Sequence, residues 1–533
     1  MQTNLLAAVL LCSCISISCN EKEQKPLKNH TLWYQYPATY WNSQALHLGN
    51  GYMGISFFGG VEQETFALSE KSMWTGGPAN GDWERAGVNP KAKETIPVIR
   101  KAVVEGRNKE ADSLISHNVF GSSELYGFFT SVGDLRITFP DHQGDYQNYK
   151  RSLDLKKSLG TVTYKMNDVA YKREYFCLYL DRLMAMKFTS DATESISFKL
   201  AVDIMQDSSI ATIRNNVYEV RGYIDGNQRP FHILIHVDNE GGVIGKEDGY
   251  LTLKNANSAV LYLTIATNYQ MKYPDYTGRD PELITKSIIE NAVNQHYDEL
   301  KMRHVSDYQK LFNRVSFSVS GNPEVEKLPT NERFQRLRDG KSDPGYKVLA
   351  FHLGRYMIIS SSRPNTLPAN LQGGWNAFYV APWSGNYQSN INLQEIYWSC
   401  GPTNLDECQE PYVDWIENLS ISGKEISARV YGTDGWVSHT TGNIWGHAAP
   451  IGDHPWGMYP MGAAWHCEHL WEQFAFTQDS MYVEKQAYAL LSVWDFNMGI
   501  ESVEATIFER FYVDFLYYLF SDELGEELYA VLL

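Results

Sequence analysis

The sequence is poor in cysteine. Of the seven cysteines in 533 residues, three lie in the first 19 positions and four are scattered over the rest. Four widely spaced cysteines do not form a disulfide framework, and none of their spacings fits a zinc site. Only Cys400 and Cys408 are close enough in sequence to pair, if a turn separates them. The sequence therefore excludes a small disulfide-stapled scaffold, and we expect no metal and no other cofactor.

Positive charge is also scarce. The chain carries 46 Lys and Arg against 63 Asp and Glu, which gives a formal net charge of −17. Binding to a polyanion depends on neutralising many phosphates with basic side chains. Nucleic acid is therefore not an expected partner, whereas a neutral ligand remains compatible with the composition.

Several catalytic and nucleotide-binding motifs are missing. The sequence contains no phosphate loop, no dinucleotide fingerprint, no HExxH and no nucleophile elbow. The glycine-rich segment 49–54 lacks a strand–helix context and predicts a tight turn. Beyond the N-terminus no segment is apolar enough to span a bilayer.

The N-terminus predicts export. An apolar run at 5–11 is followed by small residues, Cys19 and the polar segment 20–25. This order resembles a bacterial lipoprotein signal over residues 1–19, in which Cys19 is lipidated and becomes the mature N-terminus. Cys14 is a rival site, and an ordinary secretory signal is the alternative. We expect a lipoprotein on the periplasmic or outer face of the outer membrane, held to the membrane only by its lipid.

Aromatic residues are abundant. The chain has 14 Trp, 34 Tyr and 23 Phe, together 13% of its residues. Aromatic rings fill large β-rich cores, and they also stack on the apolar faces of pyranose sugars. Composition alone therefore leaves a large core and sugar recognition as two interpretations.

The pattern along the chain predicts a multidomain protein of β and α structure. Short alternating runs predict strands at 134–139, 161–165, 183–189, 195–201 and 259–266. We expect an N-terminal β-sandwich over 30–280, with one helical insertion between 90 and 115. A helical linker is expected over 281–344, with one connecting helix at 281–312 and a short strand at 315–319.

The region 345–497 is expected to be helical. Helices are predicted at 346–361, 392–399, 406–419, 461–474 and 481–496. The loops between them are long and rich in Gly, Pro and Trp, which is typical of a helical toroid with a binding site at one end. A plain helical bundle is the alternative, although bundles use short polar loops.

Two of these loops combine tryptophans with side-chain amides. In the first, 367–398, Trp375 and Asn376 precede Asn390 and Asn392. Amides supply paired donors and acceptors that match vicinal sugar hydroxyls. In an extended run, Asn390 and Asn392 would point the same way. The alternative is that these amides cap turns and helices.

The second loop, 435–456, contains Trp436, His439 and Asn443. A tryptophan beside a histidine and an amide again suits a sugar ring. The three histidines of this loop are seven and eight residues apart, so a metal site is not expected there.

Several segments, in order, resemble glycoside hydrolase family 95, the α-L-fucosidases and related α-L-galactosidases. They are 46–60 (LHLGNGYMGISFFGG), 74–78 (WTGGP), 132–139, 355–376, 390–398, 435–450 and 456–471. The resemblance implies an N-terminal β-sandwich, a helical linker, an (α/α)6 barrel and a C-terminal β domain. It also implies inverting cleavage of terminal α-linked L-fucose from fucosylated oligosaccharides or polysaccharides.

The same resemblance suggests residue roles. A Glu would act as general acid, and an Asp would activate a water that two Asn residues hold. The Asn-x-Asn motif falls on Asn390 and Asn392, which are the candidate catalytic residues. Glu395 and Ile396 depart from the usual Met-Asn that follows this motif.

The candidate substrate-binding residues lie in the two Trp-rich loops. They are Trp375, Asn376, Trp436, His439 and Asn443.

The resemblance stops near position 497. The family's acid lies in a Ser-Pro-Glu segment that this sequence does not contain, and 498–533 is divergent, acidic and aromatic. We expect a premature or frameshifted end; a divergent helix that plugs a shortened barrel is the alternative. The barrel over 345–497 is then only the first part of a toroid. Very low α-L-fucosidase activity follows, with a non-catalytic remnant that at most binds fucosides as the alternative.

Overall fold

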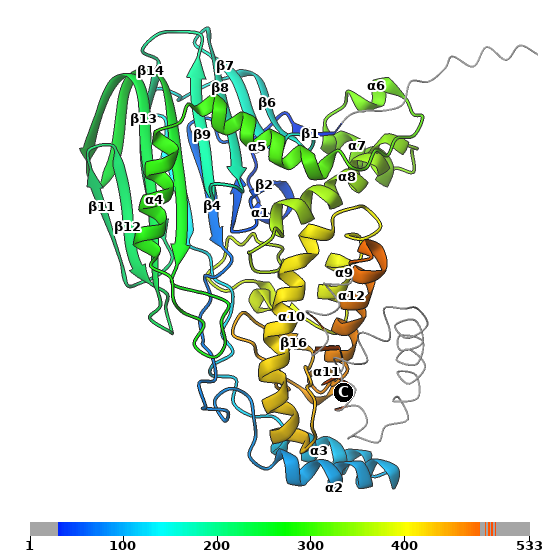
Figure 1. The fold of residues 1–533 in the computed structure, drawn as a ribbon. Helices are drawn as coiled ribbons and strands as arrows, with labels where there is room; N and C mark the ends of the chain where they lie inside the picture. The colour runs from blue at the N-terminus through cyan, green and yellow to red at the C-terminus, as the bar shows by residue number, and fades with distance from the viewer. Residues whose placement is uncertain (1–29, 480–485, 487–488, 491, 494–495, 497–533) are drawn as a thin grey trace, which may run out of the picture.

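The computed structural model describes residues 30–479, 486, 489–490, 492–493 and 496 of the chain. The first part of the chain forms a large curled β-sheet, and the later part is helical (Figure 1). The predicted signal segment, Cys19 and the divergent segment 498–533 lie outside the described residues. No helix in the described part combines the length and the apolarity needed to cross a membrane.

Fourteen antiparallel strands form one hydrogen-bonded network. They are β1 (Thr31–Tyr34), β2 (Leu46–Gly49), β3 (Met53–Phe57), β4 (Gln63–Glu70), β5 (Gly133–Thr138), β6 (Gln147–Asp154), β7 (Leu159–Met166), β8 (Val169–Leu178), β9 (Leu183–Ser190), β10 (Ile196–Ile204), β11 (Ser209–Arg214), β12 (Val217–Tyr223), β13 (Pro230–Glu247) and β14 (Tyr250–Thr267). Their order is β1-β6-β7-β8-β9-β14-β10-β5-β4-β3-β2, and β13, β12 and β11 continue from β14. The five predicted strands are confirmed.

The long hairpin of β13 and β14 explains why the sheet curls. Along one edge of β14, its first half pairs with β10 and its second half pairs with β9, while β13 occupies the other edge. The sheet therefore divides into two arms. The arms face each other, because the rings of Phe57 and Phe66 lie 5.2 and 5.0 Å from the ring of Tyr175 on the opposite arm. Aromatic and aliphatic side chains from both arms fill the space between them.

Two helices cover the outer face of the sheet. The helix α4 (Pro281–Val293) lies on β13 and β14, and α5 (Tyr297–Phe312) lies on β8 (Figure 1). Asp280 caps α4 by accepting hydrogen bonds from two backbone N–H groups of its first turn. The single helix expected over 281–312 is wrong, because the chain leaves the helical conformation between α4 and α5. The expected strand at 315–319 is also wrong, since this segment has no strand pairing.

The helical part confirms four of the predicted helices. It contains α6 (Pro323–Glu326), α7 (Thr330–Arg338), α8 (Pro344–Ser361), α9 (Asn392–Tyr397), α10 (Asp406–Ile426), α11 (His454–Gly457) and α12 (Gly462–Thr477). The helix α10 extends seven residues beyond its predicted end at 419. It packs against α12, which also contacts α9. The helix predicted at 481–496 falls largely outside the described residues.

A long excursion, residues 71–132, leaves the sheet between β4 and β5. It carries α2 (Ala92–Val104) and α3 (Asn108–Asn118), which lie beside the far end of α10 (Figure 1). The helical insertion expected between 90 and 115 is confirmed, and it consists of two helices, the second of which ends at Asn118. The first helix ends because Gly106 adopts a φ of 74°, which is left-handed. The excursion thus places residues of the chain between β4 and β5 against the loops of the helical part.

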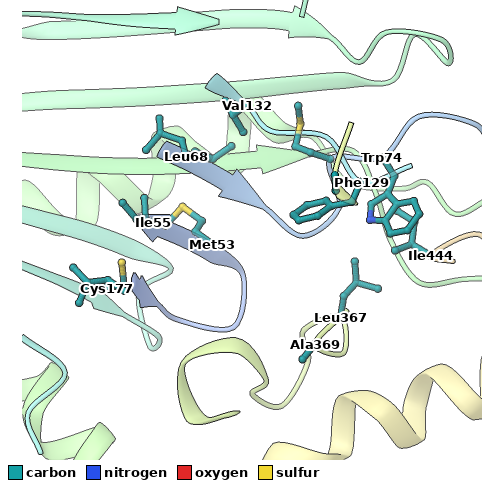
Figure 2. Close-up of a cluster of buried hydrophobic side chains, with 14 of the residues drawn as sticks. Met53, Ile55, Leu68, Trp74, Phe129, Val132, Cys177, Leu367, Ala369 and Ile444 are labelled. Atoms are coloured by element: carbon teal, nitrogen blue, oxygen red, sulfur yellow. The ribbon is translucent and has the colours of Figure 1, made fainter. Parts of the chain in front are cut away.

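The sheet and the helical part share a continuous core. Figure 2 shows Met53 and Leu68 of the strands in the same buried cluster as Leu367 and Ile444 of the helical loops. Buried Lys71 reinforces this joint, because its ammonium donates to the carbonyl of Ser361, 2.7 Å away. The joint therefore fixes how the excursion and the helical loops lie relative to each other.

Candidate functional site

A cleft of 1390 Å³ opens where the excursion meets the loops of the helical part. One wall comes from 75–78, 120–128 and the turn 225–229. The other wall comes from 379–390 and 440–456. Both Trp-rich loops that the sequence singled out thus border this cleft.

Asn390 lines the cleft. It follows the short strand β15 (Tyr387–Gln388), which pairs with β16 (Thr441–Gly442), and it is exposed. Asn392 is half-buried as the first residue of α9, and it is not among the lining residues. The expected extended run is wrong, because the backbone turns into the helix at Ile391, with φ 176° and ψ −41°. The structure thus brings one of the two candidate catalytic amides to the cleft; the roles of both stay predictions.

A chain of buried hydrogen bonds supports Ser389, the residue before Asn390. The hydroxyl of Ser389 lies 2.9 Å from Nε2 of His466, whose Nδ1 lies 2.6 Å from the Tyr412 hydroxyl. Gln394 donates to the Ser389 carbonyl at 2.6 Å. Burial lowers the pKa of His466 to about 3, so its ring is neutral and donates only one hydrogen bond. These contacts hold the loop that presents Asn390.

The first two predicted sugar contacts are buried. Trp375 is 2% exposed, and its indole N–H donates to the Leu48 carbonyl at 2.7 Å. The side-chain amide of Asn376 donates to the Phe378 carbonyl at 2.7 Å and accepts from the Phe378 N–H at 3.1 Å. In the described structure neither residue lines the cleft.

Trp436 and His439 are also enclosed. The Trp436 indole donates to the Ala489 carbonyl at 2.9 Å. The His439 ring lies between the Ala448 carbonyl, at 2.6 Å, and the Tyr431 hydroxyl, at 2.7 Å. Burial lowers the pKa of His439 to about 4. Both side chains therefore fix the second Trp-rich loop to neighbouring segments of the chain.

Asn443 forms the contacts of a turn cap. Its Nδ2 donates to the Tyr126 carbonyl at 2.7 Å, and its Oδ1 accepts from the N–H groups of Trp445 and His447 at 2.8 and 3.0 Å. Like the other four candidate substrate-binding residues, it is not a lining residue of the cleft. Sugar contact by these five side chains stays a prediction.

Three aromatic side chains that were not among the predicted contacts do line the cleft. All three are exposed: Tyr379 and Trp383 lie in the first Trp-rich loop, and Trp456 lies in the second. The sequence signal that could have found them is an aromatic residue in a Gly- or Pro-containing loop. That signal does not separate them from buried Trp375 and Trp436.

The charged side chains of the cleft are engaged with partners. Arg85 forms a two-pronged ion pair with Glu124, at 2.5 and 2.9 Å, and this hydrogen bonding lowers the pKa of Glu124. Asp225 accepts a hydrogen bond from the Tyr379 hydroxyl at 3.1 Å. Arg229 donates to two backbone carbonyls. Among the described lining residues two cations and two anions balance, so this part of the cleft carries no net charge.

Nothing in the described part of the chain gathers three or more side chains of the metal-binding types His, Cys, Asp and Glu. The four described cysteines, Cys177, Cys400, Cys408 and Cys467, are buried free thiols. The pair Cys400 and Cys408, which the sequence left open as a disulfide, is thus unlinked.

Comparison with sequence families and known proteins identifies two matching regions. Residues 296–498 match the glycosyl hydrolase family 95 catalytic domain. Residues 32–272 match the glycosyl hydrolase family 65 N-terminal domain. A solved structure from the human microbiome, with the provisional description of a kojibiose phosphorylase, has a TM-score of 0.53 at 12% identity. It covers 88% of this chain and 59% of that one, and it supports the fold alone.

Two curated relatives are similar along most of the chain. "Alpha-L-fucosidase 2" of Arabidopsis thaliana is 33% identical over 499 residues, which cover 88% of this chain and 58% of that protein. "Probable alpha-fucosidase A" of Aspergillus niger is 29% identical over 481 residues, which cover 86% and 59%. The chain thus spans somewhat less than three fifths of the length of these relatives. The family-model match and these relatives support an assignment of the chain to glycoside hydrolase family 95.

Proposed function

We propose that the chain acts on terminal α-L-fucosyl linkages of neutral glycans and hydrolyses them with inversion. The observation that carries this proposal is the position of Asn390 in the wall of a neutral cleft. Two relatives named as fucosidases support the choice of sugar. Fucosylated oligosaccharides or polysaccharides are the proposed substrates.

In an inverting reaction, water attacks the face of the sugar opposite the leaving oxygen. The amide oxygen of Asn390, which lines the cleft, would hold this water by accepting a hydrogen bond from it. Asn392, the first residue of α9 and outside the lining, is proposed as the second amide of the pair. The His466–Ser389 contact described above supports the loop in which Asn390 stands.

The proposed architecture is a β-sandwich over 30–280, a helical linker over 281–344 and helices of an (α/α)6 toroid over 345–497. The two facing arms of the sheet and the packing of α10 against α12 support it.

Export as a lipoprotein, with Cys19 lipidated, is the proposed location. Growth of the native host with a labelled fatty acid tests this proposal: the chain should carry label, and Cys19→Ala should lose it. A chain without label, or label that persists in Cys19→Ala, would contradict lipidation of Cys19.

The test of the proposed activity is hydrolysis of an aryl α-L-fucoside by the purified chain, with the sugar anomer followed by NMR. We expect β-L-fucose as the first product, at a rate below the usual range of about 1–10³ s⁻¹. The low rate follows because Glu124 and Asp225, the carboxylates lining the described cleft, are both engaged. Asn390→Ala should abolish turnover, whereas Asn294→Ala, an exposed amide on the linker, should not. An α-anomer would contradict inversion, and no turnover would contradict hydrolysis.

A second candidate function is fucoside binding without turnover. The observation that favours it is the Arg85–Glu124 pair, which keeps the cleft's Glu ionised and so unable to donate a proton as an acid. Calorimetric binding of L-fucose by a chain that shows no turnover would support this candidate over the first.

A further inference from the structure

Trp383 is held in an unusual position on the cleft wall. Its side chain is 74% exposed. The 3-10 turn Pro382–Gly385 places Trp383, Ser384 and Gly385 at φ values of 49°, 60° and 58°. Left-handed backbone is unfavourable for a residue with a bulky side chain, and it persists only where the surroundings impose it.

The surroundings that impose this conformation come from the excursion. The Phe129 N–H donates to the Ser384 carbonyl at 2.9 Å, and the Phe129 carbonyl accepts from the Ala381 N–H at 3.1 Å. A Cβ on Gly385 would lie 2.8 Å from Cβ of Phe129, so the turn fits closely against this residue.

Phe129 is itself anchored in the shared core. Its buried ring stacks on Trp74 with a centroid distance of 6.2 Å, and both lie near Ile444 (Figure 2). The turn is therefore fixed on both sides to the core of the protein. A rigid turn that exposes a large ring offers a flat apolar surface at little entropic cost of binding.

The rest of the cleft matches a sugar chain. Trp456 and Tyr379 add two exposed rings, and Asn386 and Gln388 add amides to the lining. A lining that combines rings and amides suits pyranoses, which have apolar faces and hydroxyl edges. The balanced charges favour a neutral ligand over a sulfated or phosphorylated one.

The size of the cleft indicates more than one sugar unit. Pockets for small ligands have volumes of about 300–1,000 Å³. The cleft exceeds this range at 1390 Å³.

We propose that Trp383 stacks on a pyranose ring of the neutral oligosaccharide that carries the terminal fucose, so that the cleft binds an extended chain. The inference rests on the proposed function and specifies its substrate class. Trp383 is then a specificity-determining residue that contacts the part of the glycan behind the scissile linkage.

The test is calorimetric titration of the full chain with a neutral fucosylated trisaccharide, with free L-fucose and with a sulfated fucan oligosaccharide. Trp383→Ala should weaken trisaccharide binding roughly 2- to 13-fold, the change that corresponds to one aromatic stacking contact. Trp383→Phe should retain most of the affinity. Binding of free L-fucose should be the same in all variants.

Phe334→Ala is the matched control, because this exposed ring lies on α7, outside the cleft. It should leave both affinities unchanged. Equal trisaccharide affinity of the unmodified chain and Trp383→Ala would overturn this inference alone. Tighter binding of the sulfated oligosaccharide would overturn the neutral ligand. If the unmodified chain binds neither fucose nor the trisaccharide, the proposed function and this inference are both overturned.

Discussion

Arg173 lies between the two arms of the curled sheet with only 2% of its surface exposed. Its guanidinium donates to the Val61 carbonyl and the Tyr164 hydroxyl at 2.6 and 2.7 Å. It also lies 3.7 Å from the fully buried carboxyl of Glu64. Burial raises the pKa of Glu64, and Arg173 is the main influence that opposes this rise. Arg173 therefore helps to keep the buried Glu64 carboxyl ionised.

Replacing Arg173 by Met should destabilise the protein by about 3–5 kcal/mol, because Glu64 loses its partner inside the core. Urea unfolding at pH 8 measures the loss. The loss should be smaller at pH 5, where the carboxyl can take up a proton. The neighbouring substitution Lys172→Met removes an exposed partner of Glu174 and should cost less than about 1 kcal/mol. Equal losses for the two variants would disprove the role given to Arg173.

At the scale of single residues, the sequence identified the important loops but not the direction of their side chains. Trp375 and Trp383 stand in the same loop, yet one is 2% and the other 74% exposed. The difference arises from distant contacts, since the hydrogen-bond partner of Trp375 is Leu48, 327 residues away. Such contacts leave no local pattern, so core and cleft tryptophans look alike in sequence. The family resemblance predicted Asn390, which does line the cleft.

At the scale of elements, α5 is the helix that links sheet and helical part. It buries Leu300 against the outer face of the sheet, together with Phe176 and Leu183. On its opposite side it exposes Met302, which is 66% exposed. The helix is thus amphipathic, and its buried side supplies most of its stability.

Leu300→Ala should lower the free energy of unfolding by about 2–5 kcal/mol, since it leaves a cavity under a fully buried side chain. Met302→Ala on the same helix should change it by less than about 0.5 kcal/mol. Thermal or chemical unfolding of both variants checks the pair. A loss for Leu300→Ala no greater than that for Met302→Ala would show that α5 does not depend on this contact.

Strands were easier to predict than helix boundaries or strand order. Alternating polar and apolar residues identified β5, β7, β9, β10 and part of β14. The prediction of one connecting helix over 281–312 failed because a local turn interrupts the helical pattern between α4 and α5. A turn at Gly106 likewise divides the predicted helical insertion into α2 and α3. The pairing of β10 with both β5 and β14 depends on contacts between residues far apart, which periodicity does not encode.

At the scale of the whole molecule, buried histidines should govern the acid stability. Burial lowers the pKa of eight described histidines to about 3 or 4: His47, His142, His304, His352, His439, His447, His466 and His469. Below an unfolded pKa of about 6.5, the unfolded chain takes up protons that the folded chain refuses. The contribution of these neutral histidines to the free energy of unfolding is therefore fully present above pH 6.5 and decreases as the pH falls towards 4. Buried Glu64 and Glu70, whose pKa values are raised, oppose this trend but are outnumbered.

We expect the melting temperature to fall steadily between pH 6.5 and pH 4, which differential scanning fluorimetry measures. His447→Gln removes one of the titrating groups. It should reduce the slope of unfolding free energy by up to about 1.4 kcal/mol per pH unit in this window. A melting temperature that stays constant from pH 7 to pH 4, or an unchanged slope in the variant, would contradict this explanation.

The hairpin of β13 and β14 also affects when the sheet can form during synthesis. One strand of each arm, β9 and β10, cannot complete its pairing before β14 has been synthesised, and the last residue of β14 is Thr267. At roughly 5–20 residues per second, a ribosome needs roughly 13–53 s to reach that point. Until then, β9 and β10 each lack a neighbour and present free backbone groups to other chains. The hairpin that closes the sheet thus sets how long the nascent strands need protection from aggregation.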